Sequence, residues 1–143
     1  MKLRLALIVA TLVMSASSVM AAPKLAGQTI MSFDSGHGTQ VEYFDKSGRT
    51  FLWYPGNRVV LPGAWKIQGE DICFAYGPNT YNPVTGQVGG NWECQDLTVN
   101  QRYAVERQAG DVFGLSTSEK PPFVLKPART SIAKLLKRIT PAD

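Results

Sequence analysis

Turn-forming residues recur every few positions between residues 28 and 99 and divide this part of the chain into short segments with β-strand character. In the segment 39–45, Val41 and Tyr43 alternate with Gln40 and Glu42. Similar short segments, separated by Gly, Pro, Asn and Asp, lie at 49–54, 58–61, 64–68, 72–76 and 91–99. Short strands at this spacing are typical of antiparallel sheets, and no helical periodicity interrupts them. We therefore predict a mainly β fold, an antiparallel meander or small β-barrel.

The first 21 residues have the organisation of a secretory signal peptide. Lys2 and Arg4 precede an apolar run at 5–14, and small or apolar side chains lead to a cleavage site after Ala21. The run is shorter than the roughly 20 apolar residues that a membrane-spanning helix needs. We expect a periplasmic or secreted protein that starts near Ala22.

Removal of this peptide leaves about 122 residues, which is enough for one domain. We expect a signal peptide at 1–21, a β domain at 22–128, and a short helix with a tail at 129–143. Loss of Lys2 and Arg4 lowers the formal net charge from +4 to +2. A nucleic-acid-binding protein usually has a much larger, clustered positive charge, so we expect no nucleic-acid partner.

The chain has two cysteines, Cys73 and Cys94. An even pair in an exported protein predicts one disulfide, worth about 3 kcal/mol for a loop of this length. With a single histidine in the chain, we expect no metal site and no cofactor. Direct pairing of the two strands would set Asp71 opposite Asp96 and apolar residues against polar ones. We therefore expect either a bulge or two strands that are not simple neighbours.

The C-terminal part predicts a short amphipathic helix at 131–139, after a proline-rich segment at 121–127. Thr130 or Ser131 can cap it, and its apolar residues form one stripe: Ile132, Leu135, Leu136 and Ile139. A helix this short needs a surface to cover its stripe. We favour the β domain over a lipid interface, because the helix has few cations and no aromatic anchor.

The uncharged loop at 77–90, bracketed by the cysteines, is the strongest candidate for a binding surface. Its ligand would be neutral and polar, such as a sugar, stacked and hydrogen-bonded by Tyr81, Trp92, Asn79, Asn82 and Gln87. The alternative is an ordered connection whose residues satisfy turn geometry.

Other polar clusters give weaker indications. Asp34, Ser35 and His37 are close in sequence, but they predict a solvated turn rather than a catalytic triad. No established nucleophile, zinc or phosphate motif is present, so no catalytic residue is assigned. Trp53 and Trp65 occupy strand positions, which favours a place in the core.

Two resemblances accompany these patterns. The Gly63-Ala64-Trp65 triplet resembles the G-x-W of lipocalins and related inhibitor barrels, although here at least two predicted strands precede it. More broadly, residues 41–94 resemble small exported bacterial proteins of uncharacterised function, through G-x-W-x-I, I-C-F-x-Y and a second Cys. This resemblance implies a compact β domain in the cell envelope and no particular activity.

These observations predict an exported, non-enzymatic binding or envelope-associated module. Its partner would be an envelope polymer, a glycan or another envelope protein. The alternatives are a small periplasmic hydrolase with a carboxylate-based site and a protein that contacts the membrane surface through its basic C-terminal helix. Two carboxylates facing each other in a cleft would favour the hydrolase.

Overall fold

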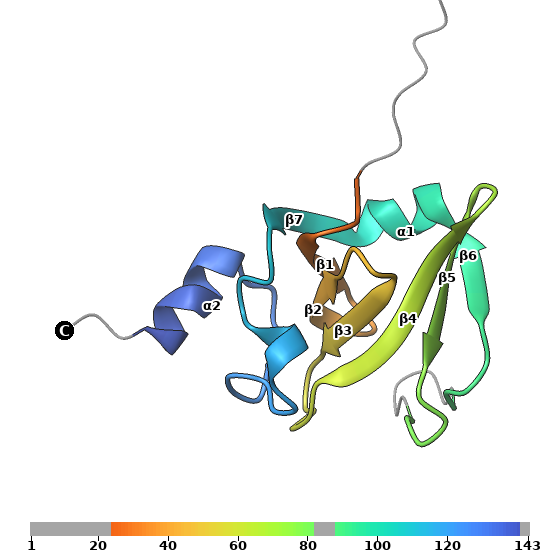
Figure 1. The fold of residues 1–143 in the computed structure, drawn as a ribbon. Helices are drawn as coiled ribbons and strands as arrows, with labels where there is room; N and C mark the ends of the chain where they lie inside the picture. The colour runs from red at the N-terminus through yellow and green to blue at the C-terminus, as the bar shows by residue number, and fades with distance from the viewer. Residues whose placement is uncertain (1–23, 82–87, 141–143) are drawn as a thin grey trace, which may run out of the picture.

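The computed structural model describes residues 24–81 and 88–140, which form a curled, seven-stranded antiparallel sheet with two α-helices (Figure 1). The sheet order is β6-β5-β4-β3-β2-β1-β7. The strands are β1 (Gln28–Asp34), β2 (Gly38–Phe44), β3 (Arg49–Trp53), β4 (Leu61–Gln68), β5 (Asp71–Tyr76), β6 (Glu93–Asp96) and β7 (Ala104–Ala109). Six strands form a meander, and β7 pairs with β1 at the far edge. The prediction of a mainly β, antiparallel fold is confirmed, in the form of a half-barrel. The predicted signal peptide lies outside the described residues.

Local turn chemistry explains the hairpins. Between β2 and β3, the Asp45 carboxylate accepts a hydrogen bond from the Ser47 N–H at 2.7 Å. Gly48 follows with φ 85°, a left-handed conformation that glycine adopts without a steric penalty. The same segment was predicted as a turn.

The two faces of the sheet carry different residues because side chains alternate along each strand. The rings of Phe44 on β2 and Phe74 on β5 lie 6.1 Å apart, although β3 and β4 separate these strands. Only a sheet that curls toward this face brings the two rings together. We call it the concave face, and the opposite one the convex face.

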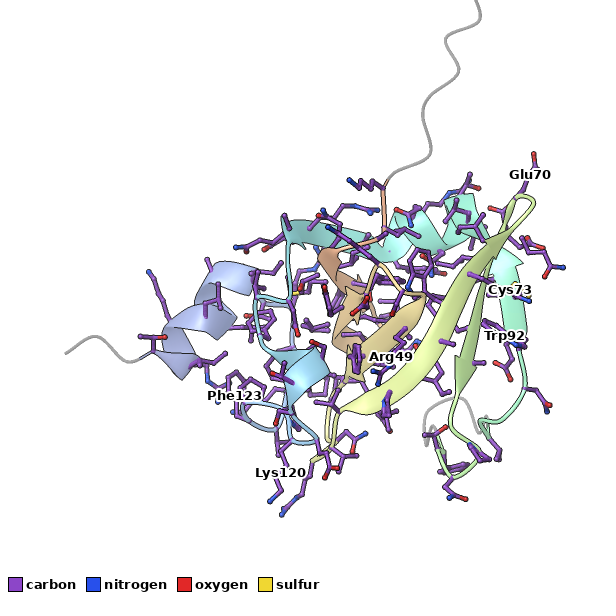
Figure 2. All side chains as sticks on the ribbon, in the orientation of Figure 1. Arg49, Glu70, Cys73, Trp92, Lys120 and Phe123 are labelled. Carbon is purple, nitrogen blue, oxygen red and sulfur yellow. A yellow bond between two sulfur atoms is a disulfide. The ribbon has the colours of Figure 1, made fainter. Side chains whose placement is uncertain are left out.

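The convex face carries the main hydrophobic core. Trp53 is fully buried there, with the rings of Phe113 and Phe123 edge-on to it at 5.5 and 5.0 Å, and its indole N–H donates to the Phe123 carbonyl oxygen at 3.0 Å. Phe123 and the helix α2 (Ile132–Ile139) lie on the same side of the molecule (Figure 2). The predicted core position of Trp53 is confirmed.

Helix α2 packs into this same core. Ile132 and Leu135 are buried in it, and Leu136 packs against it. Ser131 caps the helix by accepting a hydrogen bond from the Lys134 N–H at 3.2 Å. Docking of the apolar stripe on the β domain, which the sequence favoured, is confirmed, although Ile139 remains 41% exposed.

One end of the concave face is closed by α1 (Leu97–Tyr103), which crosses from β6 to β7 (Figure 1). An apolar cluster fills this end and contains Leu25, Ile30, Phe44 and Ile72, with Trp65, Phe74, Leu97 and Ala104 packed against them. The predicted core position of Trp65 therefore holds in part. We call this the closed end of the half-barrel.

The prediction of a continuous strand over 91–99 was wrong. β6 ends at Asp96, and α1 begins at Leu97. The Asp96 carboxylate caps the helix by accepting a hydrogen bond from the Val99 N–H at 2.9 Å. This cap satisfies a backbone donor of the first turn and so favours a helix over continued strand pairing.

The expectation of either a bulge or non-neighbouring strands at the two cysteines was also wrong. Cys73 pairs directly with Cys94 and forms the predicted disulfide, and Asp71 does lie opposite Asp96. This register is tolerated because both aspartates are exposed and Asp96 is engaged in capping α1. β6 is an edge strand whose four residues are all exposed, so its polar side chains need no buried partners.

Candidate functional site

A pocket of about 630 Å³ lies on the concave face, next to the apolar cluster, with which it shares Phe74. It extends along β6 as far as Asn100 of α1. Its wall combines aromatic, aliphatic and polar side chains, mainly those of His37, Gln40, Glu42, Leu52, Leu61, Phe74, Tyr76, Thr80, Tyr81, Val88, Asn91, Glu93 and Gln95. The curl of the sheet therefore creates a hollow that α1 closes at one end, a shape that suits a small ligand.

Glu42 on β2 is the central polar group of this pocket. Its Oε1 atom accepts a hydrogen bond from the Thr50 hydroxyl at 2.6 Å and another from the Tyr76 hydroxyl at 2.7 Å. Burial raises the pKa of the Glu42 carboxyl above its ordinary value, although both hydrogen bonds favour the ionised form. Among the described residues, no lysine, arginine or histidine forms a salt bridge with Glu42.

Tyr76 reaches Glu42 across the floor of the half-barrel, from β5 to β2. Its ring passes over Gly63 of β4, its register partner. A Cβ atom on Gly63 would lie 2.8 Å from the ring carbon Cδ1 of Tyr76 and 2.9 Å from the Ala75 carbonyl oxygen. Gly63 therefore makes the room that the ring needs.

The protonation state of Tyr76 follows from the same contact. Burial, together with the charge and hydrogen bond of Glu42, raises the pKa of the Tyr76 phenol well above its ordinary value. The phenol therefore stays protonated at neutral pH and acts as the donor to Glu42.

Aromatic and aliphatic side chains surround this polar centre. The rings of Phe74 and Tyr76 are parallel, with centroids 6.2 Å apart and planes inclined by 4°. Leu52 and Leu61, a register pair on β3 and β4, line the same wall. The pocket thus offers flat apolar faces beside one carboxylate.

Tyr81, a residue of the predicted binding loop, lies at the edge of this pocket. It is 58% exposed and pairs with Val88 through an isolated β-bridge. Its carbonyl oxygen accepts a hydrogen bond from the Tyr54 hydroxyl at 3.4 Å. The described ends of the loop are thereby anchored, and Tyr81 is part of the pocket wall while remaining largely exposed to solvent.

The other predicted ligand residues do not gather around Tyr81. Trp92 lies on the convex side of the sheet, because Lys66, which points to that side, has its Nζ atom 4.4 Å from the Trp92 ring centroid. Asn79 is exposed and is not part of the pocket wall. Asn82 and Gln87 lie outside the described residues. Tyr81 and Trp92 therefore belong to opposite faces and do not form one platform.

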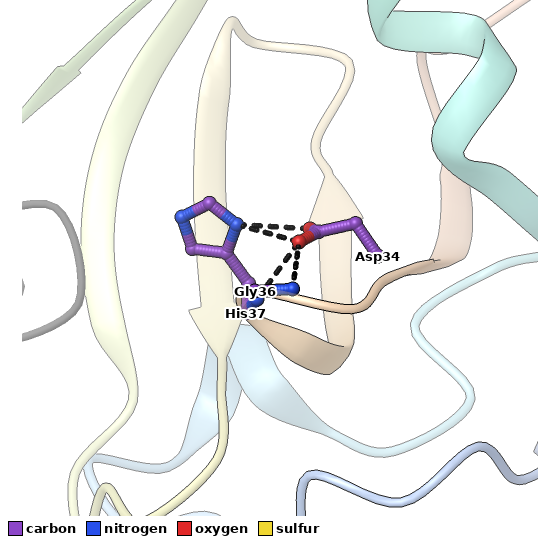
Figure 3. A network of polar contacts seen from close by, with 3 residues as sticks. All are labelled: Asp34, Gly36 and His37. Atoms are coloured by element: carbon purple, nitrogen blue, oxygen red, sulfur yellow. Dashed lines mark hydrogen bonds and ion pairs between the residues drawn. The ribbon is translucent and has the colours of Figure 1, made fainter.

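Asp34 and His37 form a compact contact at the β1–β2 turn, as Figure 3 shows. His37 Nδ1 lies 2.9 Å from Asp34 Oδ2, and the backbone N–H groups of Gly36 and His37 each donate to Asp34 Oδ1 at 2.8 Å. Partial burial opposes ionisation of Asp34, but these hydrogen bonds outweigh it and lower its pKa. Ser35 is exposed beside them. The predicted turn is confirmed, and only His37 of the three residues lines the pocket.

The described part of the chain holds no group of three or more His, Cys, Asp or Glu residues able to bind a metal ion. Within the same residues, none of the helices combines the length and the apolar character needed to cross a membrane.

No protein-family model, no curated protein and no solved structure matches this chain. The resemblance to small exported bacterial proteins therefore stays a prediction. The Gly63-Ala64-Trp65 triplet lies on β4, the fourth strand of the meander, and not on the first strand as in lipocalins.

Sequence reasoning did not single out Glu42, Tyr76 and Gly63 as site residues. Glu42 was placed on the polar side of its strand. Gly63 drew attention only as part of the triplet with Trp65. A carboxylate flanked by apolar residues within a central strand was the one local signal that pointed to Glu42.

Proposed function

We propose that this protein is an exported, non-enzymatic binding protein that holds a small ligand in the concave pocket. The observation that carries the proposal is the combination of a cavity of about 630 Å³ with the Glu42 carboxylate at its centre. Cavities of roughly 300–1,000 Å³ with apolar walls and a few convergent polar groups are typical of small-molecule sites. A polymer chain would need a groove that is open at both ends, whereas α1 and the apolar cluster close one end of the concave face.

Native mass spectrometry tests this proposal directly. The purified protein is equilibrated with the low-molecular-mass fraction of a bacterial envelope extract, and retained ligands are read as added mass. Leu61→Trp fills the pocket from β4, whereas Ile67→Trp adds the same ring at an exposed position on the same strand and face. We expect a bound species with the parent and Ile67→Trp that is lost with Leu61→Trp. Equal retention by Leu61→Trp, or no bound species in any sample, would contradict the proposal.

A hydrolase is the second candidate, because Glu42 and Glu93 line the same pocket from β2 and β6. A carboxylate pair on opposite walls is the arrangement that general acid–base hydrolysis requires. The same experiment separates the two functions. A hydrolase converts the retained species into products that together contain one additional water, and Glu42→Gln abolishes this conversion. A binding protein releases its ligand unchanged.

Export is part of the proposal and rests on the predicted signal peptide at 1–21. An intact mass that starts within about two residues of Ala22, measured on protein from the periplasm or the medium, supports it. A full-length mass in that fraction would contradict it. Membrane contact through α2 is not favoured, because Ile132 and Leu135 of its stripe pack into the convex core.

A further inference from the structure

The described wall of the pocket carries negative charge without a neighbouring lysine or arginine. This wall has the Glu42 carboxylate at its centre and includes neither a lysine nor an arginine. His37, the one basic side chain on the wall, is in contact with Asp34. The field inside the pocket therefore favours a positive ligand over a neutral or negative one.

The hydrogen bonding of Glu42 leaves a place for one more donor. Both bonds that Glu42 accepts from described residues, from Thr50 and Tyr76, go to Oε1. Oε2 takes part in no hydrogen bond among those residues. Among the described residues, the half-buried carboxylate therefore has one oxygen held in position by two hydrogen bonds and a second that none of them engages, which a ligand in the pocket can reach.

The walls next to Glu42 suit the organic part of such a ligand. Phe74 and Tyr76 form a parallel pair, and Tyr81 is also part of the pocket wall. Aromatic faces attract ammonium groups through cation–π interactions and also accommodate alkyl or aryl substituents. A bare metal ion fits less well, because the described residues hold no group of three or more His, Cys, Asp or Glu side chains that could bind one.

We propose that the pocket binds a small organic cation, an ammonium carrying an alkyl or aryl group, with Glu42 as its counter-ion. This inference rests on the proposed binding function and assigns the chemical class of its ligand. The ammonium N–H donates to Glu42 Oε2, and the substituent lies against Phe74 and Tyr76. Leu52 and Leu61 complete the apolar contact.

The test compares three probes of nearly equal shape by isothermal titration calorimetry. They are phenethylamine, phenethyl alcohol and 3-phenylpropionate, which present a cation, a neutral hydroxyl and an anion on the same ring. A hydrogen bond to a charged group contributes about 1.5–3 kcal/mol, which is about 10- to 150-fold in Kd. We expect the amine to bind at least about 10-fold more tightly than the alcohol, and the carboxylate to bind weakest. This comparison needs no variant.

Two variants then locate the effect. Glu42→Gln keeps the size of the side chain and removes its charge, so the preference for the amine over the alcohol should disappear. Glu70→Gln removes a carboxylate from the exposed β4–β5 turn and should leave the preference unchanged. Circular dichroism checks that both variants are folded.

The outcomes separate this inference from the binding function on which it rests. If the alcohol or the carboxylate binds as well as the amine, and Leu61→Trp blocks that binding, the pocket is a ligand site but the cationic class is wrong. If the amine preference survives Glu42→Gln in a folded protein, the assignment of Glu42 is wrong. If none of the probes binds, the inference fails, and the extract experiment alone decides whether the pocket binds another class of ligand.

Discussion

Gly63→Ala is the sharpest test of how the pocket floor is built. The added Cβ would lie 2.8 Å from Tyr76 Cδ1 and 2.9 Å from the Ala75 carbonyl oxygen, whereas non-bonded carbon atoms prefer about 3.5–4.0 Å. The Ala75 oxygen belongs to the backbone of β5, so rotation of the Tyr76 ring cannot relieve both contacts. Overpacking of this kind typically costs about 1–3 kcal/mol. We expect the free energy of unfolding to fall by that amount.

Gly77→Ala provides the matched control, because its new Cβ would meet its nearest atom, Thr80 Cγ2, at an ordinary 4.0 Å. Urea unfolding of both variants should show a loss for Gly63→Ala and a change within about 0.5 kcal/mol for Gly77→Ala.

A double-mutant cycle identifies the contact responsible. Tyr76→Ala removes the ring but leaves the Ala75 carbonyl in place. In that background the cost of Gly63→Ala should shrink by at least about 0.5 kcal/mol. Equal losses for the two glycine variants, or an undiminished cost in the Tyr76→Ala background, would refute the role assigned to Gly63.

Three further changes test other parts of the structure. Replacing Cys73 and Cys94 by Ser should lower the free energy of unfolding by about 2–5 kcal/mol, and free thiols in freshly isolated protein would contradict the pairing. Leu135→Ala should cost about 2–5 kcal/mol because the side chain is buried in the convex core, whereas the exposed Lys137→Ala should change stability by less than about 0.5 kcal/mol; similar values for both would show that α2 is not part of the folded domain. The raised pKa of Glu42 means that the folded protein binds this proton more tightly than the unfolded chain. The carboxyl therefore costs no stability below its unfolded pKa of about 4.5 and destabilises the protein as pH rises through its folded pKa. Glu42→Gln should gain stability relative to the parent between pH 4 and pH 8, and a relative loss over that range would contradict the sign of the shift.

Elements with local causes were predictable from the sequence. The segment 39–45 became β2 (Gly38–Phe44), and the helix expected at 131–139 became α2 (Ile132–Ile139). In both cases the limits are set by neighbouring residues: the Asp45–Gly48 turn follows the strand, and the Ser131 cap precedes the helix. Such signals act within four or five residues and are visible in the sequence.

Helix α1 was not predicted because its sequence lacks the pattern of a helix with one buried face. None of its residues is buried, so it has no apolar stripe that a periodicity argument can detect. Trp92 and Cys94 alternate with polar residues just before it, which favoured a strand. The Asp96 cap and the need to cross from β6 to β7 decided the outcome.

The binding pocket could not be predicted because it depends on the curl of the sheet. Alternation along β2 separates Gln40 and Glu42 from Val41 and Tyr43, and an isolated strand would present the first pair to solvent. Curling brings β5 over β2, so that Tyr76 meets Glu42 although 34 positions separate them in the sequence. Local sequence patterns cannot predict a contact between residues so far apart in the chain.

The two faces of the sheet differ in packing, and this difference explains how the domain tolerates a half-buried carboxylate at its centre. The convex face buries large apolar side chains under the C-terminal segment and holds the larger of the two apolar clusters. The concave face has an apolar cluster only at its closed end. At the open end, Gly63 and Thr50 are small, so the floor of the pocket stays hollow. Burial at this position raises the pKa of the Glu42 carboxyl, which means that its ionised form is destabilised there. The hydrogen bonds from Thr50 and Tyr76 hold the Glu42 carboxylate at this position and offset part of the cost of burying its charge. A cationic ligand that pairs with the Glu42 carboxylate would offset more of the cost of burying its charge. Glu42 is therefore the residue to test first.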